Sequence, residues 1–401
     1  MLMVKTMKQT VWKLENAIKN FDWGSLDQIT KVLGISNSTQ KPIAEIWMGA
    51  HPMGCSQAID SDNHKVKLDE LINNNPQAIL GEDTYKKFAG LPYLFKILSA
   101  NKALSIQVHP TKTAAECGFE KENELGIALD DPKRNYKDPN HKPELIYALT
   151  PFKAMRSFRP ISEILNLFGQ ISVTTLSKEI AQLQNNPNEQ QLKLFFQTLL
   201  TLSSERKHQA IKQLLTNIAS FYNEPYATIK DLANDYPNDI GIFMPLILNV
   251  IELQPGQAMF LDAQTPHAYI KGTGLEVMAN SDNVLRAGLT HKYIDIEQLI
   301  QNTNFDSLTL NNLLIKPIIN ANKISFPVPV DDFNFEIIYS NDQQQEQKVT
   351  SAQIVLCLEG KICLTTEFES VVLSKGESAF IAYQAKEYCY TGEGILAKVS
   401  N

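Results

Sequence analysis

The chain has 401 residues, of which 43% are hydrophobic and 20% charged, and its formal net charge is -7 at pH 7. This length exceeds that of one ordinary domain, and the composition excludes an intrinsically disordered chain. The acidic balance disfavours a nucleic-acid partner, because proteins that bind nucleic acids usually present a basic surface. We therefore expect a globular protein of two or three domains, in which any anionic ligand is bound by a local basic pocket.

The sequence shows no signal for a membrane span or for secretion. The longest strongly apolar stretch, residues 240–253, is too short to cross a bilayer and contains Pro245 and Asn249. The N-terminus lacks the continuous apolar core and the cleavage site of a secretory signal. The five cysteines are scattered, odd in number and without a CxxC pair, which is typical of a reduced cytosolic protein. We expect a cytoplasmic protein with no membrane partner.

The first part of the chain, up to about residue 155, is expected to be β-rich. Short β-like runs occur at residues 43–48 and 103–108, and polar connections separate them. The longest of these connections, DDPKRNYKDPNHKPE at residues 130–144, is rich in proline and asparagine and is typical of a loop. We therefore interpret this region as a β domain with long loops.

The apolar period changes to that of an amphipathic helix between residue 161 and about residue 236. Two groups of apolar residues recur at i, i+3, i+4 and i+7: Leu192, Phe195, Phe196 and Leu199, then Ile211, Leu214, Leu215 and Ile218. Pro160 precedes this segment and Pro237 follows it, and each proline tends to interrupt regular structure. The spacing predicts a helical insert.

The last part of the chain contains an internal repeat. The segment LQPGQAMFLDAQTPHAYIKGTGLEV begins at Leu253 and aligns without gaps with LSKGESAFIAYQAKEYCYTGEGILA, which begins at Leu373; 373 minus 253 gives an offset of 120. The two copies share turn glycines and apolar positions, which predicts two versions of one antiparallel unit. We interpret them as two jelly-roll barrels in a mainly β protein with a helical insert.

The repeat also indicates which copy carries chemistry, because the polar positions are not shared. His267 aligns with Glu387, and Glu276 aligns with Leu396. We therefore expect the C-terminal barrel to be structural and to bind neither a metal nor a substrate. The expected domains are a catalytic domain formed by residues 1–155 and 241–320, a helical insert at 156–240, and a C-terminal barrel at 321–401.

Residues from separate parts of the chain form a candidate metal site. Gln107 and His109 alternate in LSIQVHP, so on a strand their side chains would point to the same face. His267 lies in the first copy of the repeat, and Glu144 ends the long polar loop. These side chains would offer nitrogen and oxygen ligands, for which zinc is the leading candidate. Each residue taken singly is more commonly structural, so the spacing alone does not decide.

Several separated blocks resemble type I phosphomannose isomerases. The blocks are NFDWGS (20–25), AEIWMGAHPMG (44–54), LPYLFKILSANKALSIQVHP (91–110), NHKPELIYAL (140–149) and GTGLEVMANSDNVLRAGLTHK (272–292). The resemblance implies two cupin-type jelly-roll barrels with a helical domain. It also implies interconversion of mannose 6-phosphate and fructose 6-phosphate, and one zinc ion per chain held by Gln107, His109, Glu144 and His267. The one mild variation is Phe21 in NFDWGS.

Such an isomerisation needs a group that moves a proton between neighbouring carbons through an enediol. The candidates in the matching blocks are His141, Lys142, Glu276 and Asp282. The resemblance favours His141, Lys142 and Asp282, without choosing among them. Arg286 lies among apolar and small residues, where an unpaired guanidinium is costly to bury, so we expect it to face an anion or a pocket in the catalytic site.

The remaining candidates would bind the substrate. Lys96 in LFKIL is expected to bind phosphate or sugar, unless it extends from a strand edge to solvent. By resemblance, the pocket is completed by Trp23, Glu45, His51 and Tyr269. The indole of Trp23 could pack against a sugar face.

Two other functions remain open from the sequence. A non-catalytic metal-binding cupin could sense a sugar phosphate, although the intact ligand set argues against it. A cupin dioxygenase would more often place several histidines around iron, whereas only His109 and His267 match a site here. No glycine-rich nucleotidyltransferase segment opens the chain, which argues against the bifunctional type II enzyme. We expect a monomer whose partner is a small sugar phosphate.

Overall fold

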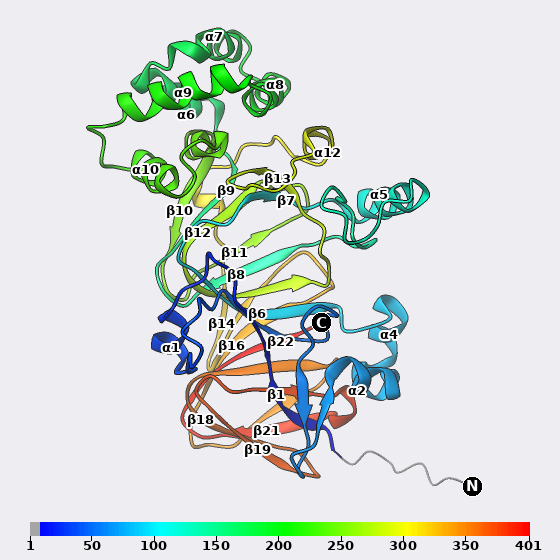
Figure 1. Cartoon of the computed structure of the whole chain (residues 1–401). Coiled ribbons are helices and arrows are strands. Elements are labelled where there is room, and N and C mark those ends of the chain that lie inside the picture. Colours follow the sequence, from blue (N-terminus) through cyan, green and yellow to red (C-terminus); the bar gives the residue numbers. More distant parts are fainter. Residues whose placement is uncertain (1–8) are drawn as a thin grey trace.

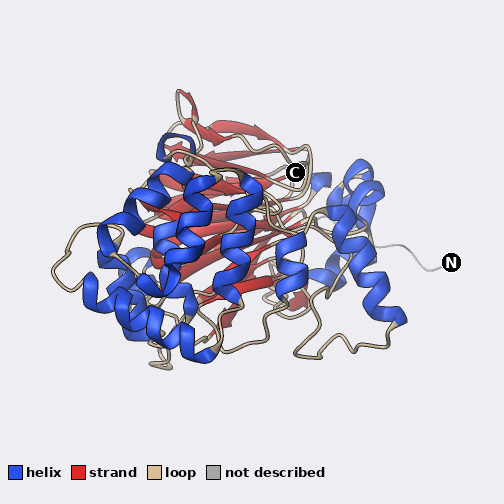
Figure 2. Cartoon of the chain, turned by 90° about the horizontal axis from the view of Figure 1, so that it is seen from above, coloured by secondary structure: helices blue, strands red, loops and turns tan. Residues whose placement is uncertain are grey.

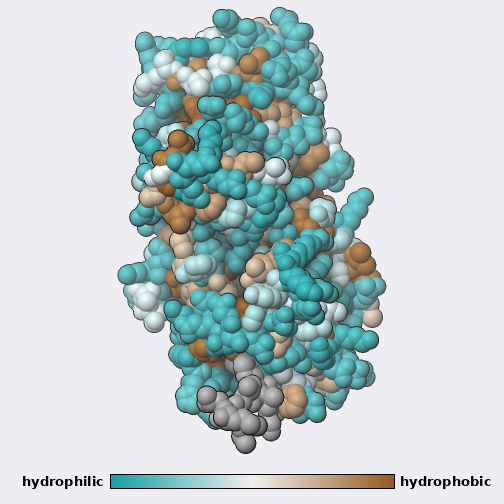
Figure 3. All heavy atoms as spheres, turned by 90° about the vertical axis from the view of Figure 1, so that its right-hand side faces the viewer, coloured by the Kyte–Doolittle hydropathy of each residue, from teal (hydrophilic) through white to brown (hydrophobic). Residues whose placement is uncertain are grey.

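The computed structural model describes residues 9–401. Figure 1 shows an elongated molecule with a block of helices at one end, a first barrel in the middle and a second barrel at the other end. Seen from above in Figure 2, the helices of that block lie side by side across the end of the strands. On the face in Figure 3, hydrophobic residues are scattered among hydrophilic ones. No helix of residues 9–401 is long and apolar enough to cross a membrane.

The first barrel is built around one long strand, β12 (His267–Ala279). This strand pairs with four others, so it takes part in both walls of the barrel. All the pairings are antiparallel. The other strands are β2 (Ala17–Lys19), β3 (Glu45–Met48), β6 (Tyr93–Ala100), β7 (Ile106–Val108), β8 (Glu144–Ala148), β9 (Phe152–Phe158), β10 (Leu248–Leu253), β11 (Ala258–Leu261) and β13 (Leu285–Gly288).

The second barrel combines C-terminal strands with three strands from the N-terminal region. Its C-terminal strands are β14 (Ile318–Asn320), β15 (Lys323–Phe326), β16 (Asn334–Ser340), β17 (Gln345–Lys348), β18 (Gln353–Thr365), β19 (Ser370–Ser374), β20 (Ser378–Ile381), β21 (Glu387–Thr391) and β22 (Gly394–Ser400). Strand β1 (Val11–Glu15) pairs with β20, and β4 (Gln57–Ile59) and β5 (Lys65–Lys67) extend the same sheet. The expected segment 1–155 therefore contributes strands to both barrels, and the three expected boundaries between segments stay a prediction.

The expected helical segment is present. Its helices are α6 (Ile161–Ile171), α7 (Ser177–Asn185), α8 (Glu189–Leu200), α9 (Ser204–Asn217) and α10 (Tyr226–Asp235), with the short 3-10 helices η1 (Thr174–Leu176) and η2 (Ile240–Phe243) and the short helix α11 (Met244–Ile247). The four apolar residues of α8 that set the period are all buried. Pro160 directly precedes α6, as the sequence suggested.

The sequence interpretation missed the helices of the N-terminal region. These are α1 (Gln28–Leu33), α2 (Leu68–Asn74), α3 (Pro76–Leu80), α4 (Glu82–Phe88) and α5 (Lys112–Glu124). Four of them are too short for a helical period to repeat. The longest, α5, buries only Ala115 and Glu122, so it carries almost no apolar stripe. The last part of the chain adds α12 (Ile296–Gln301), η3 (Leu310–Asn312) and η4 (Tyr383–Ala385).

The internal repeat corresponds to matched structural elements. Strand β11 falls on β20 at the offset of 120, and the single strand β12 falls on β21 and β22 together. The turns before β11 and β20 each contain a glycine with positive φ, 91° at Gly256 and 84° at Gly376. Because side chains with a Cβ rarely adopt this conformation, the shared glycines mark a shared turn.

A continuous hydrophobic core joins the two barrels. It includes Phe95 and Tyr147 of the first barrel together with Phe326 and Phe335 of the second. The ring centroids of Phe95 and Phe335 are 6.3 Å apart, and those of Tyr147 and Phe326 are 5.3 Å apart. Because packed interiors have few voids and deform little, this core fixes the second barrel relative to the first.

Candidate active site

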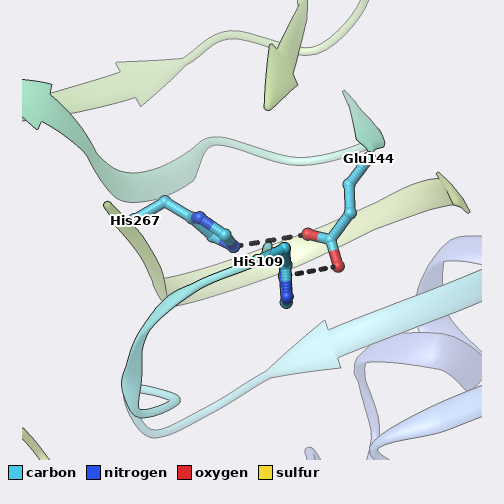
Figure 4. A group of neighbouring side chains, drawn as sticks. All are labelled: His109, Glu144 and His267. Carbon is cyan, nitrogen blue, oxygen red and sulfur yellow. Dashed lines mark ion pairs between the residues drawn. The ribbon is translucent and has the colours of Figure 1, made fainter. Parts of the chain in front are cut away.

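Three of the predicted metal ligands meet inside the first barrel, as Figure 4 shows. His109 follows the end of β7, Glu144 begins β8 and His267 begins β12. Nε2 of His109 lies 3.2 Å from one carboxylate oxygen of Glu144, and Nε2 of His267 lies 3.4 Å from the other. Their candidate ligand atoms all lie within 4.8 Å of one another, and all three residues are buried. The sequence placed His109 on the strand with Gln107, whereas β7 ends one residue earlier.

The hydrogen bonds of the two histidines determine which ring nitrogens carry the proton. Nδ1 of His109 lies 2.7 Å from the carbonyl oxygen of Asn283, and Nδ1 of His267 lies 2.9 Å from that of Thr265. A carbonyl oxygen can only accept, so each Nδ1 carries a proton and each neutral ring presents an Nε2 lone pair. Both Nε2 atoms are buried without a hydrogen-bond partner.

The electrostatics of this group fit a bound cation. Burial lowers the pKa of His109 from 6.5 to about 4, although the charge of Glu144 opposes the shift. Burial raises the pKa of Glu144, but Lys142 and the two histidines outweigh that effect and hold it well below 4.5. Two lone pairs and one carboxylate therefore face the same small space, an arrangement that a divalent metal ion would satisfy.

The fourth predicted ligand, Gln107, lies directly beside His267. These two residues are opposite each other on β7 and β12, and Gln107 is also opposite Arg286 on β13. His267 is in turn opposite Arg156 on β9. Residues directly opposite on antiparallel strands project to the same face, so all four side chains line one face of this wall. Sequence reasoning missed Arg156, because nothing in AMRSF relates it to the distant β12.

Two further predicted residues contact the carboxylate of Glu144. Nζ of Lys142 lies 3.2 Å from one of its oxygens, and the hydroxyl of Tyr269 donates to the other at 3.3 Å. Burial raises the pKa of Tyr269 well above 10, and the charges of Glu276 and Glu144 add to the shift. Tyr269 therefore keeps its proton and can act only as a neutral hydrogen-bonding group at neutral pH.

Comparisons with known proteins identify the family. The catalytic domain of type I phosphomannose isomerase matches residues 11–161, its helical insertion domain matches 167–248, and the cupin domain of mannose-6-phosphate isomerase matches 322–401. Over 389 residues the chain is 45% identical to mannose-6-phosphate isomerase of Escherichia coli K12. The match covers 97% of this chain and 99% of the relative. The chain belongs to the type I phosphomannose isomerase family.

A more distant relative and two solved structures support the same family. Mannose-6-phosphate isomerase of Rattus norvegicus is 35% identical over 406 residues, covering 92% of this chain and 93% of the relative. A single-residue variant of phosphomannose isomerase from Salmonella typhimurium superposes with a TM-score of 0.94 at 45% identity, covering 98% of this chain and all of that one. A zinc-bound mannose 6-phosphate isomerase has the same TM-score, identity and coverage. The predicted family and fold class are confirmed.

Lys96 is buried rather than extended to solvent. Its Nζ lies 2.8 Å from a carboxylate oxygen of Glu276 and 3.4 Å from one of Glu45. The second oxygen of Glu45 accepts a hydrogen bond from the indole of Trp47 at 2.9 Å. Burial raises the pKa of Glu276, and Lys96 only partly offsets this effect. One cation thus lies between two carboxylates close to the metal-ligand group.

The predicted residues His51 and Asp282 form a second pair. Nδ1 of His51 accepts a hydrogen bond from the backbone N–H of Met53, so its Nε2 carries the proton when the ring is neutral. This Nε2 lies 3.4 Å from the carboxylate of Asp282. Burial raises the pKa of Asp282, but the contact with His51 and the charges of Lys142 and Lys96 bring it below 3.8. Asp282 is therefore an anion at neutral pH.

Arg286 forms no ion pair with an acidic residue among residues 9–401, and Lys292 is close enough to be affected by its charge. Burial lowers the pKa of Arg286. Burial also lowers the pKa of Lys292, and the charges of Arg286 and Lys137 lower it further. Neither lysine was predicted, although GLTHK in one of the matching blocks contains Lys292. Arg286 and Lys292 thus carry positive charge without an ion-pair partner among residues 9–401, and such charges favour a bound anion.

Two other predicted residues lie at the margin of these groups. Trp23 is half-buried, packs against the core cluster that contains Tyr269, and stacks on Phe21 with ring centroids 5.8 Å apart. His141 forms an ion pair with Asp332 of the second barrel. Sequence reasoning did not identify Asp332. A cavity of about 720 Å³ lies elsewhere, between the first barrel and α10, and none of the predicted site residues lines it.

Proposed function

We propose that this chain is a zinc-dependent aldose–ketose isomerase that interconverts mannose 6-phosphate and fructose 6-phosphate through an enediol. The observation that carries the proposal is the pair of histidines whose Nδ1 atoms are bonded to carbonyl oxygens and whose unpartnered Nε2 atoms face the carboxylate of Glu144. The zinc-bound structure of a mannose 6-phosphate isomerase at 45% identity supports the choice of metal. One Zn²⁺ per chain would be held by Gln107, His109, Glu144 and His267.

The residues around this group suit the reaction. A Zn²⁺ ion bound there would stabilise the negative charge that develops on the substrate oxygens. Arg286 and Lys292, which have no ion-pair partner among residues 9–401, offer positive charge for the phosphate group. Lys96, Glu276 and Glu45 offer charged hydrogen-bonding groups for sugar hydroxyls. The half-buried Trp23 would pack against an apolar sugar face.

The proton transfer requires a side chain with a nitrogen or oxygen atom that is not already held by another residue. Lys142 is directed to Glu144, and Asp282 to His51. His141 is partly exposed, and among residues 9–401 its Nδ1 has no hydrogen-bond partner. We assign the transfer to His141.

His141 removes the C2 proton of the open-chain aldose, and the C–H electron pair forms the C1=C2 bond while O1 gains a proton. O2 then loses its proton, and the first proton returns to C1.

A coupled assay on mannose 6-phosphate with and without a chelator tests this function. Chelation should abolish turnover, added zinc should restore it, and the protein should contain about one zinc per chain. His267→Ala should lose both zinc and activity, whereas His208→Ala, at an exposed position of α9, should retain both. Full turnover in metal-free protein would refute the zinc requirement. Zinc binding without turnover would favour a non-catalytic cupin that senses a sugar phosphate. Cytoplasmic location and a monomeric state remain predictions from the sequence.

A further inference from the structure

One charged side chain of the second barrel contacts His141, the residue to which the proposed function assigns the proton transfer. Asp332 lies in the loop between β15 and β16, and His141 lies in the loop before β8. Nε2 of His141 is 3.0 Å from one carboxylate oxygen of Asp332 and 3.1 Å from the other. The two residues are 191 positions apart in the chain, so only the packing of the two barrels brings them together.

This contact is the only one that satisfies the carboxylate of Asp332. Asp332 is 4% exposed, and within residues 9–401 its side chain has no other hydrogen bond or ion pair. A buried carboxylate without a donor is costly. Nε2 of His141 must therefore carry a proton directed at Asp332, which leaves Nδ1 of the neutral ring as an acceptor.

Both residues are held in place from either side. Phe333, next to Asp332, is fully buried in the core that joins the barrels, and Asp331 forms an ion pair with Lys87 at 2.5 Å. On the other side, the carbonyl of Asn140 accepts hydrogen bonds from Ser281 and Asn283. The backbone next to each partner of the His141–Asp332 contact is thus anchored, at Phe333 in the shared core and at Asn140 by Ser281 and Asn283.

We propose that Asp332 is a positioning residue for the isomerisation, which holds the ring of His141 in the tautomer that takes up a proton at Nδ1. Its negative charge also stabilises the imidazolium that forms when Nδ1 is protonated. The inference rests on the assignment of proton transfer to His141 in the proposed function. This role would give the second barrel a part in the reaction, although its repeat copy has Glu387 in place of the metal-ligand candidate His267.

A double-mutant cycle tests the role of Asp332. Asp332→Asn offers an amide that can donate to Nε2 and so permits the wrong tautomer. We expect it to lower kcat by at least about tenfold with KM within about twofold, and His141→Asn to lower kcat by at least about a hundredfold. In the His141→Asn background, Asp332→Asn should have no further effect beyond about twofold. Asp342→Asn, at an exposed position in the loop between β16 and β17 of the same barrel, is the matched control and should leave kcat unchanged.

The outcomes separate this inference from the proposed function. If His141→Asn keeps normal turnover, the assignment of proton transfer to His141 is wrong. If His141→Asn is inactive but Asp332→Asn is normal, only the positioning role is wrong. An equal loss from Asp332→Asn in both backgrounds would mean that Asp332 acts independently of His141, which would overturn the positioning role. Should that variant not fold, the ¹⁵N spectrum of the wild-type imidazole decides: a proton on Nε2 is expected, and a neutral ring with its proton on Nδ1 would overturn the inference.

Discussion

Lys96 and Glu276 lie directly opposite each other on β6 and β12, and their charged atoms are 2.8 Å apart in the interior of the first barrel. Glu45 approaches the same ammonium group, so one positive charge is shared by two carboxylates. The local charge of this cluster is negative, which makes it a poorer site for phosphate than for neutral hydroxyl groups. The phosphate role predicted for Lys96 is therefore better suited to the uncompensated Arg286.

Arg286→Ala should lower kcat/KM by at least about a hundredfold without unfolding the protein, because a positioned charge that binds the substrate anion is removed. Turnover is measured with the coupled assay, and folding is checked by circular dichroism and by zinc content. Arg206→Ala is the control, since Arg206 pairs with Glu179 within the helical insert. A variant with near-normal kcat/KM would show that Arg286 does not bind the phosphate.

Glu336→Gln should destabilise the second barrel in a pH-dependent way. Glu336 forms an ion pair with the buried Lys398 at 2.5 Å. Burial raises the pKa of Glu336, but Lys398 and Lys323 outweigh this and bring it below 4.5. A carboxyl with a lowered folded-state pKa stabilises the protein above its unfolded-state pKa, and this contribution is lost as pH falls through the folded-state value.

We therefore expect Glu336→Gln to lower the free energy of unfolding by about 3 kcal/mol at pH 7, since it leaves Lys398 without its partner. The difference between wild type and variant should stay constant from pH 7 to about pH 5.5 and decrease below about pH 4.5. Urea unfolding at several pH values measures both quantities. A difference that grows as the pH falls would contradict the direction of the pKa shift.

The sequence predicted the barrels because their signals are local. The turn glycines Gly256 and Gly376 and the aligned apolar runs lie within one segment of each copy, and the strands β11 and β20 occur at matching positions. The helical insert was predictable for the same reason, since its apolar period repeats over several turns. The short N-terminal helices offered no such period, and the pairing of β1 with β20 joins residues more than 350 positions apart, at opposite ends of the chain.

The site was predictable only as a set of residue types. The resemblance and the residue chemistry pointed to His109, Glu144 and His267, and these three do meet in the structure. The apolar run LFKIL indicated that Lys96 needed a partner, but its partner Glu276 is 180 positions away and is fixed by the pairing of β6 with β12. Asp332 gave no signal, because its contact with His141 depends on how one barrel packs on the other.

The Lys96 and Glu276 pair can be tested against the second barrel, which provides an apolar version of the same position. At the offset of 120, Glu276 aligns with Leu396, and Leu396 lies opposite Ile338 on β16, with both side chains fully buried. The second barrel thus packs without an ion pair at the position that corresponds to Lys96 and Glu276. We infer that these two charges in the first barrel serve the reaction rather than stability. Replacing a buried ion pair by apolar residues of similar size is often neutral or stabilising, whereas removing one partner is costly.

Lys96→Ile alone should therefore lower the free energy of unfolding by about 3 to 5 kcal/mol, because Glu276 and Glu45 remain buried without their cation. Adding Glu276→Leu should recover most of that loss, since it recreates the apolar pair of the second barrel. Both variants should lack isomerase activity even with zinc bound. Urea unfolding, zinc content and the coupled assay measure these outcomes. A double variant as unstable as the single one would show that the ion pair is needed for packing, and an active double variant would show that it is not needed for the reaction.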